Sequence, residues 1–392
     1  MIKYPSHKKD LILITGGHLT PAVAVLSELR KRGFNNFLWV GHKYNQAGNK
    51  EFSPEYQTIK NSNIEFIDLK TGKIIRKWTR ETFIYGLKQF YLVFVGLFKS
   101  LFIILNKKPK LILSFGGYLA VPIVIWAKFL GVKVITHDQV VTPGLANKII
   151  SRFADKILVS WESSKKFFNS NKTIFTGNPI RREIFLVKSN TLTKDFFNDL
   201  PILYITGGNQ GANEINKRIF PILNMLLEDC NIIHQTGNST TTNDYQKALD
   251  LQKNLPQQLR YRYLVKDYIL ADEIGEAFNK SNLIFSRAGG NTVVEILALG
   301  KLAIFMPIPW ASHDEQTKNA EMVKSTGLGY ILIQKDYLSA QTVYQTILLG
   351  LSQYKKEKGF DNRDLKIAID NAKSLVVLDA PIRVVDEIES IL

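Results

Sequence analysis

The chain has 392 residues, 45% of them hydrophobic and 22% charged, which is the balance of an ordinary globular protein and excludes a disordered one. This length exceeds what a single hydrophobic core usually supports, so we expect two domains. The single cysteine, Cys230, excludes an internal disulfide and suits a reducing compartment. The charged N-terminus leads into only four apolar residues, Leu11–Ile14, too few for the core of a signal peptide.

The excess positive charge is confined to the first half of the chain. The formal net charge is +16, yet residues 1–180 hold 27 Lys and Arg against 10 Asp and Glu. The remaining residues are close to neutral. A basic half predicts a polyanionic partner, either nucleic acid or an anionic membrane surface. A basic protein without such a partner would spread its charge more evenly.

Short apolar runs alternate along the chain with helical patterns of a dozen residues or more. This alternation predicts parallel sheets covered by helices on both faces. The runs predicted to be strands are Leu11–Ile14, Phe37–Val40, Leu111–Ser114, Val132–Thr136, Ile157–Val159, Ile202–Ile205, Ile232–His234, Leu283–Ser286 and Leu302–Met306.

A weak internal repeat indicates that the chain has two similar halves. "LILITGGHLTPA" at Leu11, "LILSFGGYLAV" at Leu111 and "ILYITGGNQGAN" at Ile202 each read as a strand, a glycine pair and a helix. We therefore predict an α/β protein of two Rossmann-like domains that face a cleft, at 1–180 and 200–370. We expect the joint near 175–185, a linker at 187–200, and a C-terminal helix in 371–392 that packs back on the first domain. Ligands of such sheets bind beyond the carboxyl ends of the strands, where the glycine pairs lie.

The segment Phe83–Leu105 is an unusually apolar helical stretch with only two charged residues, Lys88 and Lys99. Its length would allow it to span a membrane, but two lysines within it oppose that. Their spacing of eleven residues returns both to nearly the same helical face. The pattern favours an interfacial helix, and a helix buried in its own domain is the alternative. The residues expected to contact a membrane are Lys88, Lys99, Phe90, Phe94 and Phe98.

The turn Thr15-Gly16-Gly17-His18 lacks the spacing of a dinucleotide fingerprint and of a P-loop. A histidine at a helix N-terminus has its cationic form disfavoured by the helix dipole, so it stays able to accept a proton. His18 is therefore a candidate general base, and a helix cap is the alternative interpretation.

The second half contains the best predicted anion site, "ITGGNQGANEINKRI" at Ile205–Ile219, where a glycine-rich loop opens a helix. Arg181 in "GNPIRRE" could add a fixed positive charge. In "FSRAGGNTVVEI", Glu295 on a helix behind a glycine loop could accept hydrogen bonds from a ribose diol, unless it is simply a solvated helical glutamate. No Asp-x-Asp motif and no metal-ligand spacing of histidines occurs, so we expect no metal and no cofactor.

Seven motifs in colinear order resemble the MurG family, a group of membrane-associated transferases. They are "TGGH", "SFGGY", "HDQVVTPGLANK", "GNPIR", "GGNQGANEIN", "SRAGGNTVVE" and "HDEQTKNA", between about Leu11 and Leu332. The resemblance implies a GT-B fold and inverting transfer of N-acetylglucosamine from UDP-N-acetylglucosamine to a polyprenyl-diphosphate-linked muramyl peptide, which forms lipid II for peptidoglycan. It also implies a peripheral location on the cytoplasmic face of the cell membrane.

Carried over by motif, the resemblance makes His18 the base and places Gly116, Gly117 and Tyr118 on the acceptor side. The residues that it implies for donor binding are Thr15, Gly16, Gly17, Arg181, Asn209, Gln210, Gly211, Ile269, Gly290, Asn291, Thr292, Val293, Val294, Glu295 and Gln316. The chain departs from the pattern of the family at three places that bear on the finer contacts. Leu13-Ile14 replace a glycine pair, Val140 replaces an asparagine expected to touch the sugar, and Asn209 replaces a serine.

Other functions remain open at this point. A second GT-B transferase could use another lipid such as diacylglycerol, and a UDP-N-acetylglucosamine 2-epimerase would need more titratable groups around the sugar. A nucleic-acid-binding protein would need a recognition helix or interleaved basic and aromatic residues, and the sequence shows neither.

Overall fold

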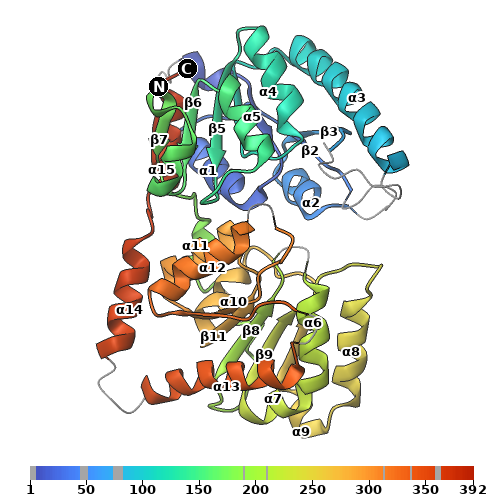
Figure 1. The fold of residues 1–392 in the computed structure, drawn as a ribbon, viewed down its shortest axis with the longest axis vertical. Coiled ribbons are helices and arrows are strands. Elements are labelled where there is room, and N and C mark those ends of the chain that lie inside the picture. The colour runs from blue at the N-terminus through green and yellow to red at the C-terminus, as the bar shows by residue number, and fades with distance from the viewer. Residues whose placement is uncertain are drawn as a thin grey trace. The chain divides into compact units, whose positions relative to one another are not determined.

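The computed structural model describes residues 6–44, 52–73, 83–188, 190–208, 211–311, 314–335, 338–357 and 363–392. The chain divides into two compact units (Figure 1). The first unit comprises Met1–Arg181 with Val377–Leu392, and the second comprises Arg182–Val376.

The first unit is built on a parallel sheet of seven strands in the order β3-β2-β1-β4-β5-β6-β7. The strands are β1 (Ile12–Thr15), β2 (Phe37–Gly41), β3 (Glu65–Asp68), β4 (Leu111–Ser114), β5 (Lys133–Asp138), β6 (Lys156–Val159) and β7 (Thr173–Phe175). The helices are α1 (Leu19–Lys31), α2 (Pro54–Asn61), α3 (Phe83–Lys107), α4 (Ala120–Phe129), α5 (Leu145–Phe153) and α15 (Ala380–Glu389).

Two hydrophobic layers cover this sheet, one on each face. Successive residues of a strand point to opposite faces, so Ile12 and Ile14 of β1 enter the layer with α1, α2 and α15. Leu13 enters the other layer, which contains α4 and α5 and the buried residue Ile104 of α3. The C-terminal helix α15 is held by ion pairs from Arg32 and Lys156.

The second unit has a parallel sheet of six strands in the order β10-β9-β8-β11-β12-β13. The strands are β8 (Ile202–Thr206), β9 (Asn231–Gln235), β10 (Tyr263–Lys266), β11 (Leu283–Ser286), β12 (Leu302–Phe305) and β13 (Gly329–Ile331). The helices are α6 (Asn213–Ile219), α7 (Leu223–Asp229), α8 (Asp244–Asn254), α9 (Gln257–Arg260), α10 (Ile274–Lys280), α11 (Gly290–Leu299), α12 (Glu315–Ser325), α13 (Ala340–Glu357) and α14 (Arg363–Ser374).

All nine predicted strands occur, with ends that match or differ by at most two residues. The sequence missed β3, β7, β10 and β13, which are the four edge strands of the two sheets.

The segment expected to be a linker is instead packed on the second unit. Leu192 is buried, and the main-chain N–H groups of Leu192 and Thr193 donate to the carboxylate of Glu276 on α10. Position 371, where the C-terminal helix was expected to separate, lies inside α14, and the chain re-enters the first unit at Val377.

Candidate functional site

Each sheet has a point where the strand order reverses, and the predicted glycine loops lie there. In the first unit this point lies between β1 and β4, whose carboxyl ends lead into the loops of Gly16-Gly17 and Gly116-Gly117. In the second unit it lies between β8 and β11. Parallel sheets bind ligands at such switch points because the two loops diverge and leave a crevice.

The two glycines before His18 are explained by contacts inside the first unit. Gly17 has φ of +136°, and a Cβ there would lie 2.8 Å from the main-chain oxygen of Gly116. A Cβ on Gly16 would lie 1.7 Å from Oε1 of Glu55. The loops therefore need glycine to pack on each other and on a carboxylate, whether or not a phosphate approaches them. Thr15, before them, is fully buried.

His18 is held by a hydrogen bond across the switch point and does not cap its helix. It is the N-cap residue of α1 but makes no side-chain cap bond, which contradicts the alternative interpretation. Its Nδ1 lies 2.9 Å from the main-chain oxygen of Phe115. A carbonyl oxygen can only accept, so in the neutral ring Nδ1 has the proton and Nε2 has the lone pair. The half-buried ring is thus set in the tautomer that a base at Nε2 requires.

The loop of Gly116 and Gly117, which was predicted to lie on the acceptor side, is held by a short chain of polar contacts. Asn147 on α5 accepts from the N–H of Gly117 at 3.2 Å and donates to Asp138 at 3.0 Å. Burial raises the pKa of Asp138, which also accepts from the N–H of Val140. The hydroxyl of Tyr118 lies 2.7 Å from Nε2 of His42, whose pKa is lowered by burial.

The residues at the end of β5 and directly after it are buried rather than exposed to a ligand. His137 is fully buried, its Nε2 donates to the Gly177 oxygen, and its Nδ1 accepts from Gln139. Burial lowers the pKa of His137 to about 4, so the ring is neutral near pH 7. Val140 is buried as well. Its side chain therefore presents no polar group in place of the asparagine that the resemblance led us to expect.

The glycine-rich loop after β8 is described in part, because Asn209 and Gln210 lie outside the described residues. Gly211 has φ of +75°, and a Cβ there would lie 2.2 Å from the main-chain oxygen of Thr236. Gly208 has open space around its Cβ position. The loop is thus packed tightly at Gly211 and open at Gly208.

The second loop of this unit leads into α11, whose first N–H groups have no acceptor within the helix. The N–H of Val293 donates to Gly289, so the groups of Gly290, Asn291 and Thr292 precede the helical bonding pattern. The side chains of Val293 and Val294 are buried, so only their main chain could reach a ligand. Glu295 is 3% exposed, which excludes a solvated helical glutamate.

The remaining predicted donor residues lie near the carboxyl ends of neighbouring strands, apart from Arg181. The Ile269 side chain is buried, and its main chain makes no hydrogen bond within the described part of the chain. Gln316 accepts from the N–H of Ile308 at 3.1 Å, which orients its amide. Arg181 is half-buried at the end of the first unit's long segment.

Two charged residues that the sequence did not single out lie beside these loops. Glu55 on α2 accepts from the Trp39 indole at 2.7 Å, and burial raises its pKa. Arg287, after β11, donates to the Met306 oxygen, and burial lowers its pKa to about 10, so it remains charged. Arg287 stands in a quoted motif and could have been selected, whereas no local pattern marks Glu55. Among the described residues no group of three His, Cys, Asp or Glu side chains could hold a metal.

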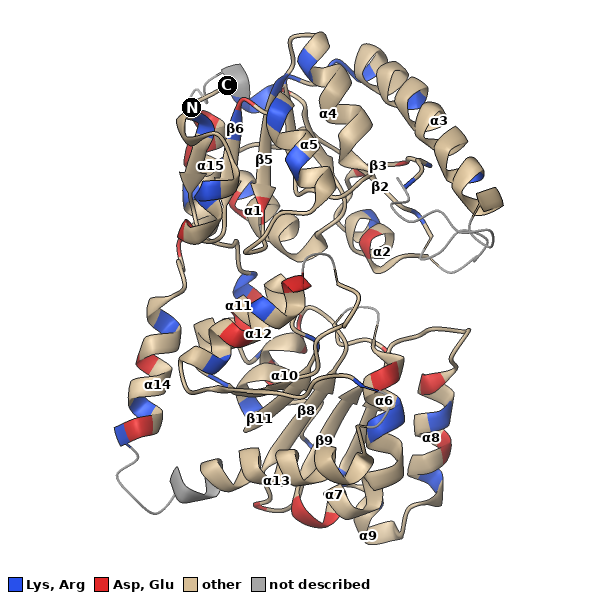
Figure 2. Ribbon diagram, in the orientation of Figure 1, with Lys and Arg blue, Asp and Glu red and all other residues tan. Residues whose placement is uncertain are grey.

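The helix α3 exposes most of its apolar side chains, which contradicts a helix buried in its own domain. It is long and apolar enough to span a bilayer by length and composition, and 17% of its most apolar window is buried. Its buried residues are Gly86, Gly96, Ser100 and Ile104. Phe90, Phe94 and Phe98 are exposed, as are Lys88 and Lys99. The helix has lysines and no acidic residue (Figure 2).

Two family models match most of the chain. Residues 15–159 match the glycosyltransferase family 28 N-terminal domain, and residues 202–372 match the C-terminal domain of that family. The chain is 33% identical over 368 residues to a UDP-N-acetylglucosamine–N-acetylmuramyl-(pentapeptide) pyrophosphoryl-undecaprenol N-acetylglucosamine transferase of Borrelia turicatae, covering 91% of this chain and 93% of the relative. The enzyme of that name from Thermoanaerobacter sp. is 31% identical, covering 96% and 97%.

Solved structures share the fold. MurG of Acinetobacter baumannii superimposes with a TM-score of 0.64 at 23% identity, covering 97% of this chain and 99% of that one. A UDP-N-acetylglucosamine 2-epimerase of Neisseria meningitidis superimposes with a TM-score of 0.60 at 15% identity, covering 97% and 99%. At these identities the likeness shows the two-domain GT-B architecture alone.

Proposed function

Because this chain belongs to the MurG family of glycosyltransferases, we propose that it transfers N-acetylglucosamine from UDP-N-acetylglucosamine to lipid I, an undecaprenyl-diphosphate-linked N-acetylmuramyl peptide. The product is lipid II, which is used in peptidoglycan synthesis. The observation that supports this best is the match of both domains to transferases of that name, 33% identical across 91% of the chain. The geometry of the two switch points then suggests how the reaction proceeds.

The catalytic step is a displacement at C1 of the donor sugar. The acceptor hydroxyl attacks C1 from the side opposite UDP, so an α-linked donor gives a β-linked product. As the new C–O bond forms, the hydroxyl proton passes to Nε2 of His18, and the bond from C1 to the UDP oxygen breaks with its electron pair on UDP. The hydrogen bond from Nδ1 to Phe115 supports this role, because it leaves Nε2 with a lone pair.

The second unit binds the donor. Glu295 accepts hydrogen bonds from the ribose hydroxyls, and the main chain of Ile269 pairs with the base. Gly207, Gly208 and Gly211 of the glycine-rich loop and the first N–H groups of α11 bind the diphosphate. Arg181 and the buried Arg287 offset the charge that develops on UDP, so the reaction needs no metal.

The acceptor lies on the first unit, beside the loop of Gly116, Gly117 and Tyr118. The exposed aromatic side chains of α3 enter the membrane interface, and its lysines attract anionic head groups. The enzyme is thus peripheral on the cytoplasmic face of the cell membrane, where a polyprenyl acceptor is available. This surface also accounts for the basic first half without a nucleic-acid partner.

The test is a reaction with alternative acceptors. Purified protein with UDP-N-acetylglucosamine and lipid I should release UDP and form lipid II. A parallel reaction with diacylglycerol, and one without acceptor analysed for the 2-epimer of the donor, test the two other enzymatic functions. Product only in either of these reactions would overturn the proposal, and a reaction lacking enzyme controls for hydrolysis of the donor.

A further inference from the structure

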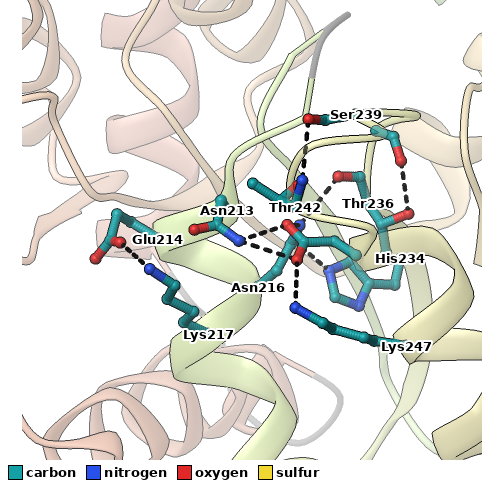
Figure 3. A network of polar contacts seen from close by, with 11 residues as sticks. Asn213, Glu214, Asn216, Lys217, His234, Thr236, Ser239, Thr242 and Lys247 are labelled. Carbon is teal, nitrogen blue, oxygen red and sulfur yellow. Dashed lines mark hydrogen bonds and ion pairs between the residues drawn. The ribbon is translucent and has the colours of Figure 1, made fainter.

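A buried cluster of polar side chains joins the start of α6 to α8 in the second unit (Figure 3). Nδ2 of Asn213 lies 2.9 Å from both carboxylate oxygens of Asp244, the first residue of α8. Nδ2 of Asn216 donates to Oδ2 of Asp244 at 2.9 Å and to the main-chain oxygen of Thr236 at 3.0 Å. Asp244 is 3% exposed, so these amides replace the water that a carboxylate would otherwise bind.

The cluster continues through a histidine with a fixed tautomer. Nε2 of His234 lies 3.0 Å from Oδ1 of Asn216, which can only accept, so Nε2 has the proton. Nδ1 then accepts from the hydroxyl of Tyr263 at 2.9 Å. Burial lowers the pKa of His234 to about 3, so the ring stays neutral at physiological pH. In the chain of hydrogen bonds that runs from Tyr263 through His234 and Asn216 to Asp244, the donor and the acceptor of each bond are therefore determined.

A nearly buried carboxylate whose ion pair is long and open to solvent is costly to retain. Lys247 lies 3.9 Å away and its side chain is 58% exposed, so it offsets little of the charge. Replacing buried charged groups by apolar side chains of similar volume often leaves a fold as stable or more stable. In some proteins, buried polar groups instead select one arrangement of the main chain. The geometry defined here is that of the first turn of α6.

The same cluster fixes the end of the glycine-rich loop. The Thr236 oxygen that accepts from Asn216 is also the atom that a Cβ on Gly211 would meet at 2.2 Å. Gly211 thus lies against a carbonyl that accepts a hydrogen bond from Asn216, and the same amide of Asn216 donates to Asp244. A change at Asp244 would shift the main chain from Gly211 to Asn213.

We propose that Asp244 is a positioning residue for the donor: it holds Asn213 and Asn216, and through them the main chain from Gly211 to Asn213, in the geometry that binds the UDP diphosphate. This inference rests on the proposed function. It assigns to Asp244 no contact with substrate and no part in proton transfer.

The experiment measures UDP affinity directly by titration calorimetry and steady-state constants in parallel. Asp244→Asn turns an amide group toward two amide donors, so UDP affinity should fall about tenfold or more and the donor KM should rise with it. The acceptor KM should stay unchanged, because the first unit is untouched. The double variant Asn213→Asp with Asp244→Asn reverses donor and acceptor across the contact and should recover part of the affinity. Lys247→Met is the matched control and should bind UDP as the parent does.

A milder variant keeps the test decisive if Asp244→Asn does not fold. Asn213→Ala removes one amide and leaves Asp244 bonded to Asn216, and it should weaken UDP binding by a smaller factor. Parental affinity in a folded Asp244→Asn or Asn213→Ala variant would overturn the positioning role. If Asp244→Asn lowered the affinity for both substrates equally, and the double variant recovered none of it, the cluster would only stabilise the fold and would not position the donor. A parent protein that binds no UDP would overturn the proposed function itself, and this inference with it.

Discussion

The substitution His18→Asn separates the base at Nε2 from the structural contact at Nδ1. The amide of asparagine can donate to the Phe115 oxygen much as Nδ1 does at 2.9 Å, but no group then occupies the position of Nε2. Loss of a general base typically lowers the rate by about 10²–10⁴-fold. This corresponds to about 3–5 kcal/mol in the activation free energy.

The free energy of unfolding distinguishes His18→Asn from His18→Ala. The asparagine variant keeps the hydrogen bond, so its free energy of unfolding should change by less than about 1 kcal/mol. The alanine variant leaves the Phe115 oxygen without this donor and should lose about 1–3 kcal/mol. The two variants should have equally low rates of turnover.

The assay follows UDP release with lipid I, alongside UDP affinity and urea denaturation. Near-parental turnover of His18→Asn would refute the base role. Loss of UDP binding in that variant would make His18 a phosphate ligand instead.

Four further outcomes are expected. Glu295→Gln should weaken UDP binding by about 1–3 kcal/mol in calorimetry, since an amide donor would face ribose hydroxyls; unchanged affinity would exclude the ribose contact. Gly17→Ala should lower the free energy of unfolding in urea by about 1–3 kcal/mol, because its φ of +136° and its contact at 2.8 Å involve main chain alone. Gly208 has a φ of +78° but open space at its Cβ position, so Gly208→Ala should lose less, and an equal loss would refute the steric argument. Replacing Phe94 and Phe98 by serine should release the protein from anionic vesicles in flotation assays with little change in stability, because both are exposed; unchanged flotation would exclude α3 as the contact. Activity should survive excess chelator, and a loss that magnesium restores would show a metal requirement.

Sequence patterns located the interior of both sheets because those strands are buried on both faces. β1, β4 and β8 are short apolar runs followed by glycines, and burial on two sides demands such composition. The edge strands escaped detection because an edge strand is only partly covered. β3 reads Glu-Phe-Ile-Asp and β13 reads Gly-Tyr-Ile, and neither is fully buried. Their pairing with a neighbour, rather than their own composition, makes them strands.

The site divides in the same way. The sequence alone determined the positions of the glycine loops, of His18 and of Glu295. The loops and His18 directly follow strands, Glu295 lies on the helix after the loop of β11, and the carboxyl ends of parallel strands share one edge. Only the tertiary structure decided which nitrogen of His18 is free, since that depends on a carbonyl 97 residues away along the chain. It also decided that Gly16 accommodates Glu55 and that α3 stays exposed. The local sequence indicates whether a residue can be buried or can donate a hydrogen bond. A contact with a residue distant in the chain forms only when the chain has folded.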